Sequence, residues 1–137
     1  MASINISDII QHGRENKITV DLLIVPKLEI GEYVAQGDIN LICIPHVPTN
    51  TFLIKNPNKQ IVSGNTRGSR HCLNSLSNVK IYQLKNANLL QICVIEFLGG
   101  ETILEHPEHK NLLWNQPMTV LVSRQRMFAD EVRAITD

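Results

Sequence analysis

The sequence predicts a mainly β protein, a small single-domain β-barrel or sandwich with at most a short helix near the N-terminus. Apolar runs of five to eight residues recur along the chain and are rich in Ile and Val, which favour strands over helices. Clusters of Gly, Pro and Asn separate these runs, as is typical of turns. Ala and other strong helix formers are scarce.

Five apolar runs are the expected strands, and they span residues 18–25, 39–44, 79–84, 90–97 and 118–122. Apolar and less apolar residues alternate in runs 79–84 and 118–122, which predicts strands with one face toward the core. Run 39–44 is apolar at nearly every position, which predicts a central strand buried on both faces. Pro45 and Pro48 would end it, because proline cannot donate to a ladder of backbone hydrogen bonds.

Helix signals are confined to the two ends of the chain. Residues 8–12 fit a short helix that Asn5 or Ser7 caps and Gly13 ends. Residues 130–135 fit either a terminal helical turn or an edge strand, and the sequence does not separate the two.

The 137 residues, of which 43% are hydrophobic, are enough for one packed core. We expect a single domain over residues 1–137, in which residues 1–35 are an N-terminal extension or the first strands and residues 36–137 form a β-rich core. No apolar run approaches the 18 or so residues of a membrane span, and the first residues lack a basic stretch followed by an apolar one. A cytoplasmic protein without a membrane partner is therefore expected. The three cysteines lack CxxC spacing and lie in apolar stretches, so we expect buried thiols rather than disulfides.

The charges sum to zero, with 13 basic and 13 acidic residues, but they are arranged in two blocks. No acidic residue lies between Asp38 and Glu96, a segment that holds six cations, whereas residues 96–108 hold four Glu and no Lys or Arg. One interpretation is that the blocks face each other or lie on separate solvated faces. The alternative is anion or nucleic-acid binding through segment 55–85, with Arg67 and Arg70 as the anion-binding residues. Aromatic side chains that could stack on bases are scarce, so nucleic acid is the less expected partner.

The densest polar segment is residues 105–109, with two histidines three positions apart. Together with His71, the imidazoles of His106 and His109 would form a three-histidine site with an open position, which suits Zn or another divalent transition metal. Glu105 or Glu108 would then orient an imidazole or act as a catalytic acid or base. The alternative is that these histidines lie exposed in loops and are flanked by solvating glutamates.

Four short strings resemble a group of small uncharacterised bacterial and phage-encoded proteins with a QGD, GHxH, HxEH and RQRE pattern. The matching strings begin at Gln36-Gly37-Asp38, Gly68-Ser69-Arg70-His71, Glu105-His106-Pro107-Glu108-His109 and Arg124-Gln125-Arg126. The resemblance covers residues 36–137 and implies a small β-rich domain with histidines gathered from two loops. Ser69 and Met127 depart from the pattern, so a four-histidine site is not available, whereas the three-histidine site remains.

Three functions follow as hypotheses. The first is a module that binds a protein partner or its own copies, with an exposed apolar patch expected around Leu112, Leu113 and Trp114. The second is a metal-dependent enzyme or metal-binding cupin-like barrel that uses the loop histidines. The third is an anion or nucleic-acid binder that uses the basic segment 55–85. Whether the protein is an enzyme is left open by its sequence.

Overall fold

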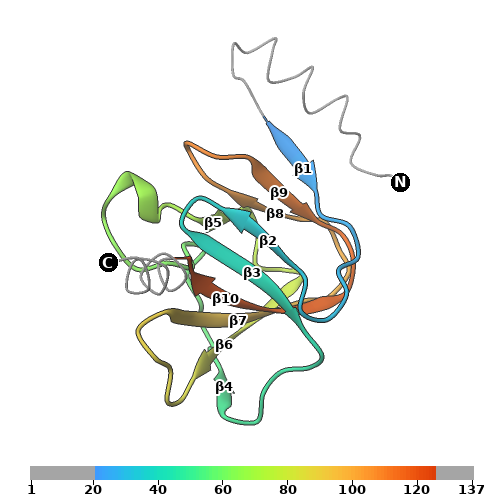
Figure 1. The fold of residues 1–137 in the computed structure, drawn as a ribbon, viewed down its shortest axis with the longest axis vertical. Coiled ribbons are helices and arrows are strands. Elements are labelled where there is room, and N and C mark those ends of the chain that lie inside the picture. Colours follow the sequence, from blue (N-terminus) through green and yellow to red (C-terminus); the bar gives the residue numbers. More distant parts are fainter. Residues whose placement is uncertain (1–20, 126–137) are drawn as a thin grey trace, which may run out of the picture.

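The computed structural model describes residues 21–125, which form two β-sheets packed against each other (Figure 1). The four-stranded sheet has the order β1 (Leu22–Ile24), β9 (Asn111–Trp114), β8 (Thr102–Glu105) and β5 (Cys72–Leu73). The six-stranded sheet has the order β2 (Tyr33–Gln36), β3 (Ile39–Ile44), β10 (Met118–Arg124), β7 (Gln91–Phe97), β6 (Val79–Leu84) and β4 (Thr51–Leu53). Within the described residues, the one helical element is a 3₁₀ turn, η1 (Arg67–Ser69).

This architecture confirms the predicted mainly β fold and selects the sandwich, because β2 and β4 leave the six-stranded sheet open at both edges. Every strand pair is antiparallel except β1 with β9, which is parallel. The strands β1 and β2 lie within residues 22–36 and join different sheets. The predicted helix at residues 8–12 and the ambiguous residues 130–135 lie outside the described residues.

The core lies between the two sheets, as the alternation within each strand requires. Val120 and Val122 of β10 point inward and are fully buried, while Leu121 between them faces outward and is half-buried. Leu104, Leu112 and Trp114 of the four-stranded sheet meet these inward side chains in one cluster. The Trp114 ring stacks on Phe97 of the opposite sheet, with ring centroids 4.4 Å apart and planes 4° from parallel.

Two expectations about buried faces are wrong. The strand β3 ends at Ile44, as expected from Pro45. Ile42 and Ile44 on its outer face are only half-buried, because no helix or strand among residues 21–125 packs over that face. The expected exposed patch at residues 112–114 is absent, since Leu112, Leu113 and Trp114 are at most 1% exposed. The reason is that β9 lies between β1 and β8 and directs Leu112 and Trp114 into the core.

All three cysteines are free, as expected, with Cys43 and Cys93 buried and Cys72 half-buried. No helix among residues 21–125 has both the length and the apolar character needed to cross a membrane.

Candidate functional site

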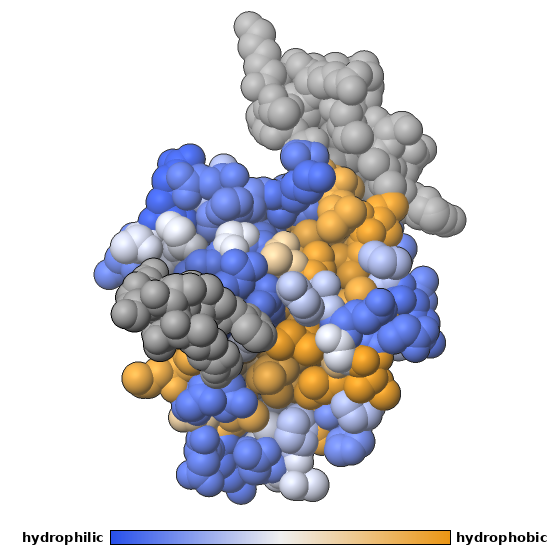
Figure 2. Space-filling view, in the orientation of Figure 1, coloured by the Kyte–Doolittle hydropathy of each residue, from blue (hydrophilic) through white to orange (hydrophobic). Residues whose placement is uncertain are grey.

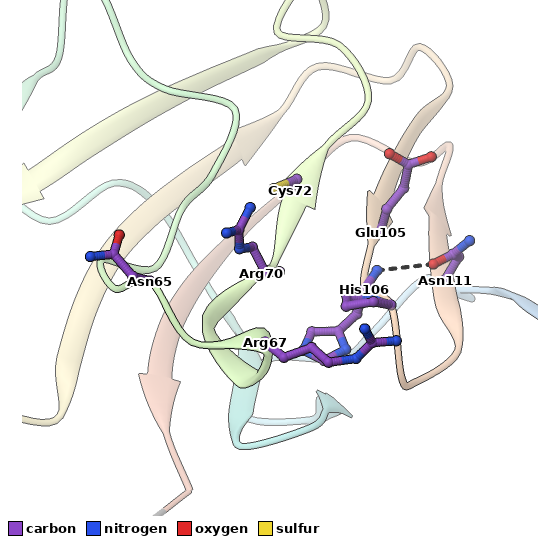
Figure 3. A pocket seen from close by; sticks show the side chains of 8 residues that line it. Asn65, Arg67, Arg70, Cys72, Glu105, His106 and Asn111 are labelled. Carbon is purple, nitrogen blue, oxygen red and sulfur yellow. Dashed lines mark hydrogen bonds between the residues drawn. The ribbon is translucent and has the colours of Figure 1, made fainter.

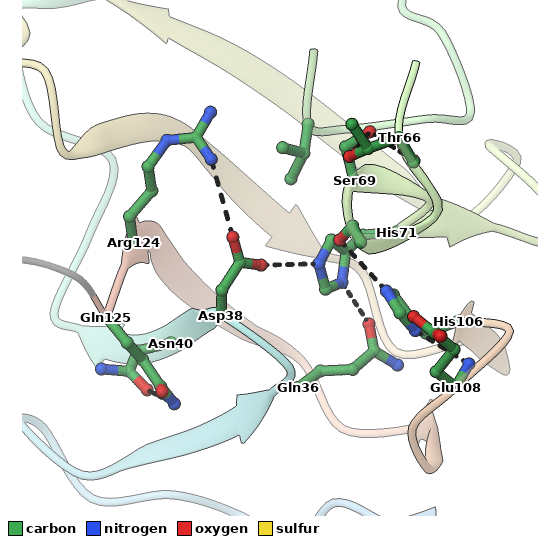
Figure 4. Close-up of polar contacts among 12 residues, drawn as sticks. Gln36, Asp38, Asn40, Thr66, Ser69, His71, His106, Glu108, Arg124 and Gln125 are labelled. Carbon is green, nitrogen blue, oxygen red and sulfur yellow. Dashed lines mark hydrogen bonds and ion pairs between the residues drawn. The ribbon is translucent and has the colours of Figure 1, made fainter. Parts of the chain in front are cut away.

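Three segments that are distant in the sequence meet at one place and bring polar side chains together (Figure 4). They are the turn between β2 and β3, the stretch from η1 to β5, and the turn between β8 and β9. The polar cluster consists of Gln36, Asp38, His71, His106 and His109. Because buried polar groups must be hydrogen-bonded to be tolerated, the partners of each side chain define what this cluster can do.

His71 is the centre of the cluster and is fully buried. Its Nδ1 lies 2.8 Å from Oε1 of Gln36, and its Nε2 lies 3.2 Å from Oδ1 of Asp38. The Gln36 side chain is itself buried, and its Nε2 donates to the carbonyl oxygens of Leu104 at 2.9 Å and Lys110 at 2.8 Å. One amide side chain therefore ties the β8–β9 turn to His71.

Asp38 connects the buried histidine to solvent, because its side chain is 45% exposed. Its second oxygen, Oδ2, lies 3.8 Å from Nη1 of Arg124 at the end of β10. Burial lowers the pKa of His71, the Asp38 carboxylate raises it, and the neighbouring imidazoles of His106 and His109 lower it further, with a net lowering. Desolvation of the charged form thus outweighs the attraction of a half-exposed carboxylate.

His106 packs against His71, with ring centroids 4.4 Å apart, and both of its nitrogens are engaged. Its Nε2 lies 3.1 Å from the carbonyl oxygen of Gly68, so Nε2 carries the hydrogen and donates it. Its Nδ1 accepts a hydrogen bond from the backbone N–H of Glu108 at 3.0 Å. Hydrogen bonds at both ring nitrogens of His106 therefore fix the two turns to each other.

His109 is exposed, and its ring lies 4.8 Å from that of His106 between centroids. No residue in the described range 21–125 forms a hydrogen bond with the ring nitrogens of His109. The ring lies over Gly37, where a Cβ atom would be 2.9 Å from Cδ2 of His109 and 3.4 Å from Cε1 of His71. Gly37 also has a left-handed φ of +58°, so both its conformation and its surroundings favour glycine.

Replacing Gly37 with alanine is expected to destabilise the fold by about 1–2 kcal/mol through left-handed strain and to displace the His109 ring. Gly31→Ala is a matched control, because Gly31 also has a positive φ, +91°, but nothing within 4 Å of its Cβ position. Urea unfolding measures the strain in both variants, and the ring proton shifts of His109 report its displacement. Unchanged His109 shifts in Gly37→Ala would contradict the close contact.

A pocket of about 670 Å³ lies beside His106, which is one of its lining residues (Figure 3). It is lined by Asn65, Arg67, Arg70, Cys72, Glu105, His106, Pro107 and Asn111. The predicted anion-binding residues Arg67 and Arg70 thus share one pocket, but Glu105 lies on its wall and Glu108 pairs with Arg67 at 3.3 Å. The lining therefore holds two guanidinium groups and one carboxylate, and the anion-binding role of Arg67 and Arg70 stays a prediction.

The basic and acidic blocks of the sequence do face each other at two points. One is the pair of Arg67 with Glu108, and the other is the cross-strand neighbours Lys80 and Glu96 of β6 and β7.

The structure brings together the three histidines that the sequence singled out, but their neighbouring carboxylate is Asp38 rather than Glu105 or Glu108. Glu105 is exposed, and Glu108 is committed to Arg67. Among residues 21–125, no group of three or more His, Cys, Asp and Glu side chains is placed so that it could hold a metal ion. Gln36 and Asp38 were missed as site residues, although both lie in the string Gln36-Gly37-Asp38 that the sequence had singled out.

A second surface with functional character is the outer face of the six-stranded sheet. Six registered neighbours form an apolar row across all six strands, and we name it the apolar stripe: Tyr33, Ile42, Leu121, Val94, Tyr82 and Leu53. Figure 2 shows hydrophobic surface in the middle of the view, where Figure 1 places β3 and β10. Solvated sheet faces normally carry polar residues, so an apolar row is unusual there. Of its six members, Tyr33 and Leu53 are exposed and Val94 is fully buried.

The fold and the polar cluster define a small β-sandwich domain with a buried histidine network between three turns. The chain belongs to a family described as a domain of unknown function, DUF8820, whose model matches residues 35–116. The match contains every residue of the polar cluster and stops before β10. No curated protein and no solved structure matches the chain.

Proposed function

We propose that this domain is a protein-binding module, and that the apolar stripe on the outer face of the six-stranded sheet is its contact surface. The supporting observation is the composition of that face. The stripe crosses all six strands of this sheet and contains no charged residue. Its two ends, Tyr33 and Leu53, are 59% and 49% exposed. Val94 in its middle is fully buried and offers no side-chain surface to a partner, so the exposed contacts of the stripe are at its two ends.

The dimensions of the stripe favour an amphipathic helix of a partner protein. Six strands about 4.8 Å apart span about 24 Å, which is the length of a helix of about 16 residues. The stripe is one residue wide, which matches the apolar ridge that such a helix lays on a surface. Lys80 and Glu96 flank the stripe on one side, so the polar flank of the helix would meet one charge of each sign.

A second copy of the chain fits this surface less well. A stable dimer buries roughly 800 Å² on each partner, and sheet-on-sheet packing needs apolar side chains over a broad area rather than in one row. Thr119 and Asn40, which lie beside the stripe on β10 and β3, are polar.

Replacing both Tyr33 and Leu53 with glutamate is expected to weaken binding of the partner helix at least about tenfold, because each apolar side chain contributes about 1.5–3 kcal/mol when fully buried. A photo-crosslinking amino acid at position 33 first identifies the contacted segment in cells of the source organism. That segment is then made as a labelled peptide, and fluorescence anisotropy gives its affinity for the wild-type and variant domains. Leu89→Glu is the control, because Leu89 is 95% exposed and lies outside the stripe.

Three results would contradict the proposal. They are a crosslinked segment without an amphipathic helical pattern, a double variant that binds the peptide as tightly as the wild type, and a dimer in light scattering that the double variant breaks. The last result would assign the stripe to self-association. Circular dichroism of the double variant confirms that its fold is retained.

A further inference from the structure

We propose that the pocket beside His106 binds a small zwitterion, a free amino acid or a short peptide, whose carboxylate pairs with Arg70 and whose ammonium group pairs with Glu105. This inference is independent of the protein-binding proposal. The pocket lies at the β5 edge of the four-stranded sheet, whereas the apolar stripe lies on the outer face of the six-stranded sheet.

The charges of the pocket are the first observation. Among the side chains of its lining, Arg67 is already paired, because its Nε lies 3.3 Å from Oε2 of Glu108. The guanidinium group of Arg70 and the carboxylate of Glu105 form no ion pair or hydrogen bond with a residue in the described range 21–125. The pocket thus presents one unpaired cation and one unpaired anion, which do not pair with each other.

This pair of charges selects a ligand that carries both signs. An anion would be attracted by Arg70 and repelled by Glu105, and a cation would meet the reverse, whereas a zwitterion gains from both. The planar guanidinium group matches a carboxylate with two parallel hydrogen bonds, and a carboxylate accepts hydrogen bonds from an ammonium group. Figure 3 shows that the two side chains come from neighbouring segments, Arg70 from the residues before β5 and Glu105 from the end of β8.

Both side chains start from backbone that the fold holds in place. Arg70 lies between Ser69 and His71, which are both buried. Glu105 is the last residue of β8 and is paired with Cys72 of β5. Charged groups on a fixed backbone lose less freedom when a ligand binds, so more of the interaction appears as affinity.

The size and the remaining walls of the pocket fit an amino acid with an apolar side chain. The volume of about 670 Å³ lies within the range of roughly 300–1,000 Å³ that is usual for small-molecule sites. Cys72 and Pro107 give apolar contacts. The His106 ring offers its carbon atoms, because its two nitrogens are engaged by Gly68 and Glu108.

The test is a titration of the ¹⁵N-labelled full chain, followed by amide NMR shifts, with the apolar L-amino acids and with the dipeptides built from them. We expect at least one of these compounds to bind and to shift the amide signals of Arg70, Cys72 and Glu105. Acetylation of its amino group or amidation of its carboxylate should each weaken binding about tenfold, because each removes one charged hydrogen-bonded pair. Comparison of the amino acids with the dipeptides shows which of the two is the ligand.

Two variants assign the charges to their partners. Arg70→Gln should lower the affinity for the zwitterion to that of its amide and leave the affinity for the amide unchanged. Glu105→Gln should do the same with respect to the acetylated compound. Both positions are exposed, so the variants should fold, and circular dichroism checks this. Lys85→Gln is the control, because it removes an exposed cation in the turn between β6 and β7, outside the pocket.

The proposal is overturned if none of the amino acids and dipeptides binds at millimolar concentration, or if the capped compounds bind as tightly as the zwitterions. It is equally overturned if Arg70→Gln and Glu105→Gln bind the zwitterion as tightly as the wild type, or if Lys85→Gln weakens binding as much as they do. None of these results affects the protein-binding proposal, whose readout is the affinity of a partner helix for variants of the apolar stripe.

Discussion

Trp114→Ala is expected to lower the free energy of unfolding by about 3–5 kcal/mol, the usual cost of truncating a buried aromatic residue to alanine. Trp114 is fully buried on β9, and its ring stacks on Phe97 of the other sheet. The substitution removes an aromatic contact between the two layers and leaves a cavity in the centre of the sandwich. A domain of this size has roughly 5–15 kcal/mol of total stability, so the loss is a large part of it.

Urea unfolding measures this effect, with Leu89→Ala as a control that should change stability by less than about 0.5 kcal/mol, since Leu89 is 95% exposed. Trp114→Phe should cost clearly less than the alanine variant. Phenylalanine keeps a stacking ring, and the Nε1 atom that it removes has no hydrogen-bond partner among residues 21–125. If the alanine and phenylalanine variants are equally stable, the stack does not hold the layers together.

The strands that the sequence predicted well are those with a strong apolar pattern. Runs 39–44 and 79–84 coincide with β3 and β6, and run 90–97 overlaps β7 except at its first residue. The strands β2, β4, β5, β8 and β9 have two to four residues each. A segment this short cannot show a reliable period of two, so its strand state depends on partners that are distant in the sequence.

The polar cluster could be predicted only in part, because its contacts also join residues that are distant in the sequence. His71, His106 and His109 were singled out by residue type and spacing, and the resemblance added the string at residues 36–38. The hydrogen bond between Gln36 and His71 joins residues 35 positions apart, and the contact between Asp38 and His71 joins residues 33 apart. Such pairings depend on sheet order, which no local pattern specifies.

The apolar stripe could not be predicted, because it is defined by register across six strands. Tyr33, Leu53 and Tyr82 lie in three apolar segments that are distant from each other in the sequence. Only the cross-strand pairing places them in one row with Leu121. The sequence instead drew attention to residues 112–114, where consecutive apolar residues are a sign of the core.

The three cysteines are expected to differ in reactivity by orders of magnitude although they resemble each other in sequence context. Cys93 on β7 is 4% exposed and points into the core, and burial raises its pKa to about 12. Burial also raises the pKa of Cys43, with Glu29 and Glu32 adding to the effect. Cys72 is half-buried and lines the pocket beside His106.

Because the thiolate is the reactive form, alkylation of Cys93 in the native protein at about pH 8 should be roughly a thousandfold slower than that of a free cysteine with a pKa near 8.5. Cys72 should react first, Cys43 more slowly, and Cys93 only when the chain unfolds. Mass spectrometry of peptides after timed treatment with iodoacetamide gives the three rates, and denatured protein, in which all three should react alike, is the control. Labelling of Cys93 as fast as Cys72 in native protein would show that β7 opens to solvent, and the two-layer core would then not be the closed structure that the burial of Cys93 requires.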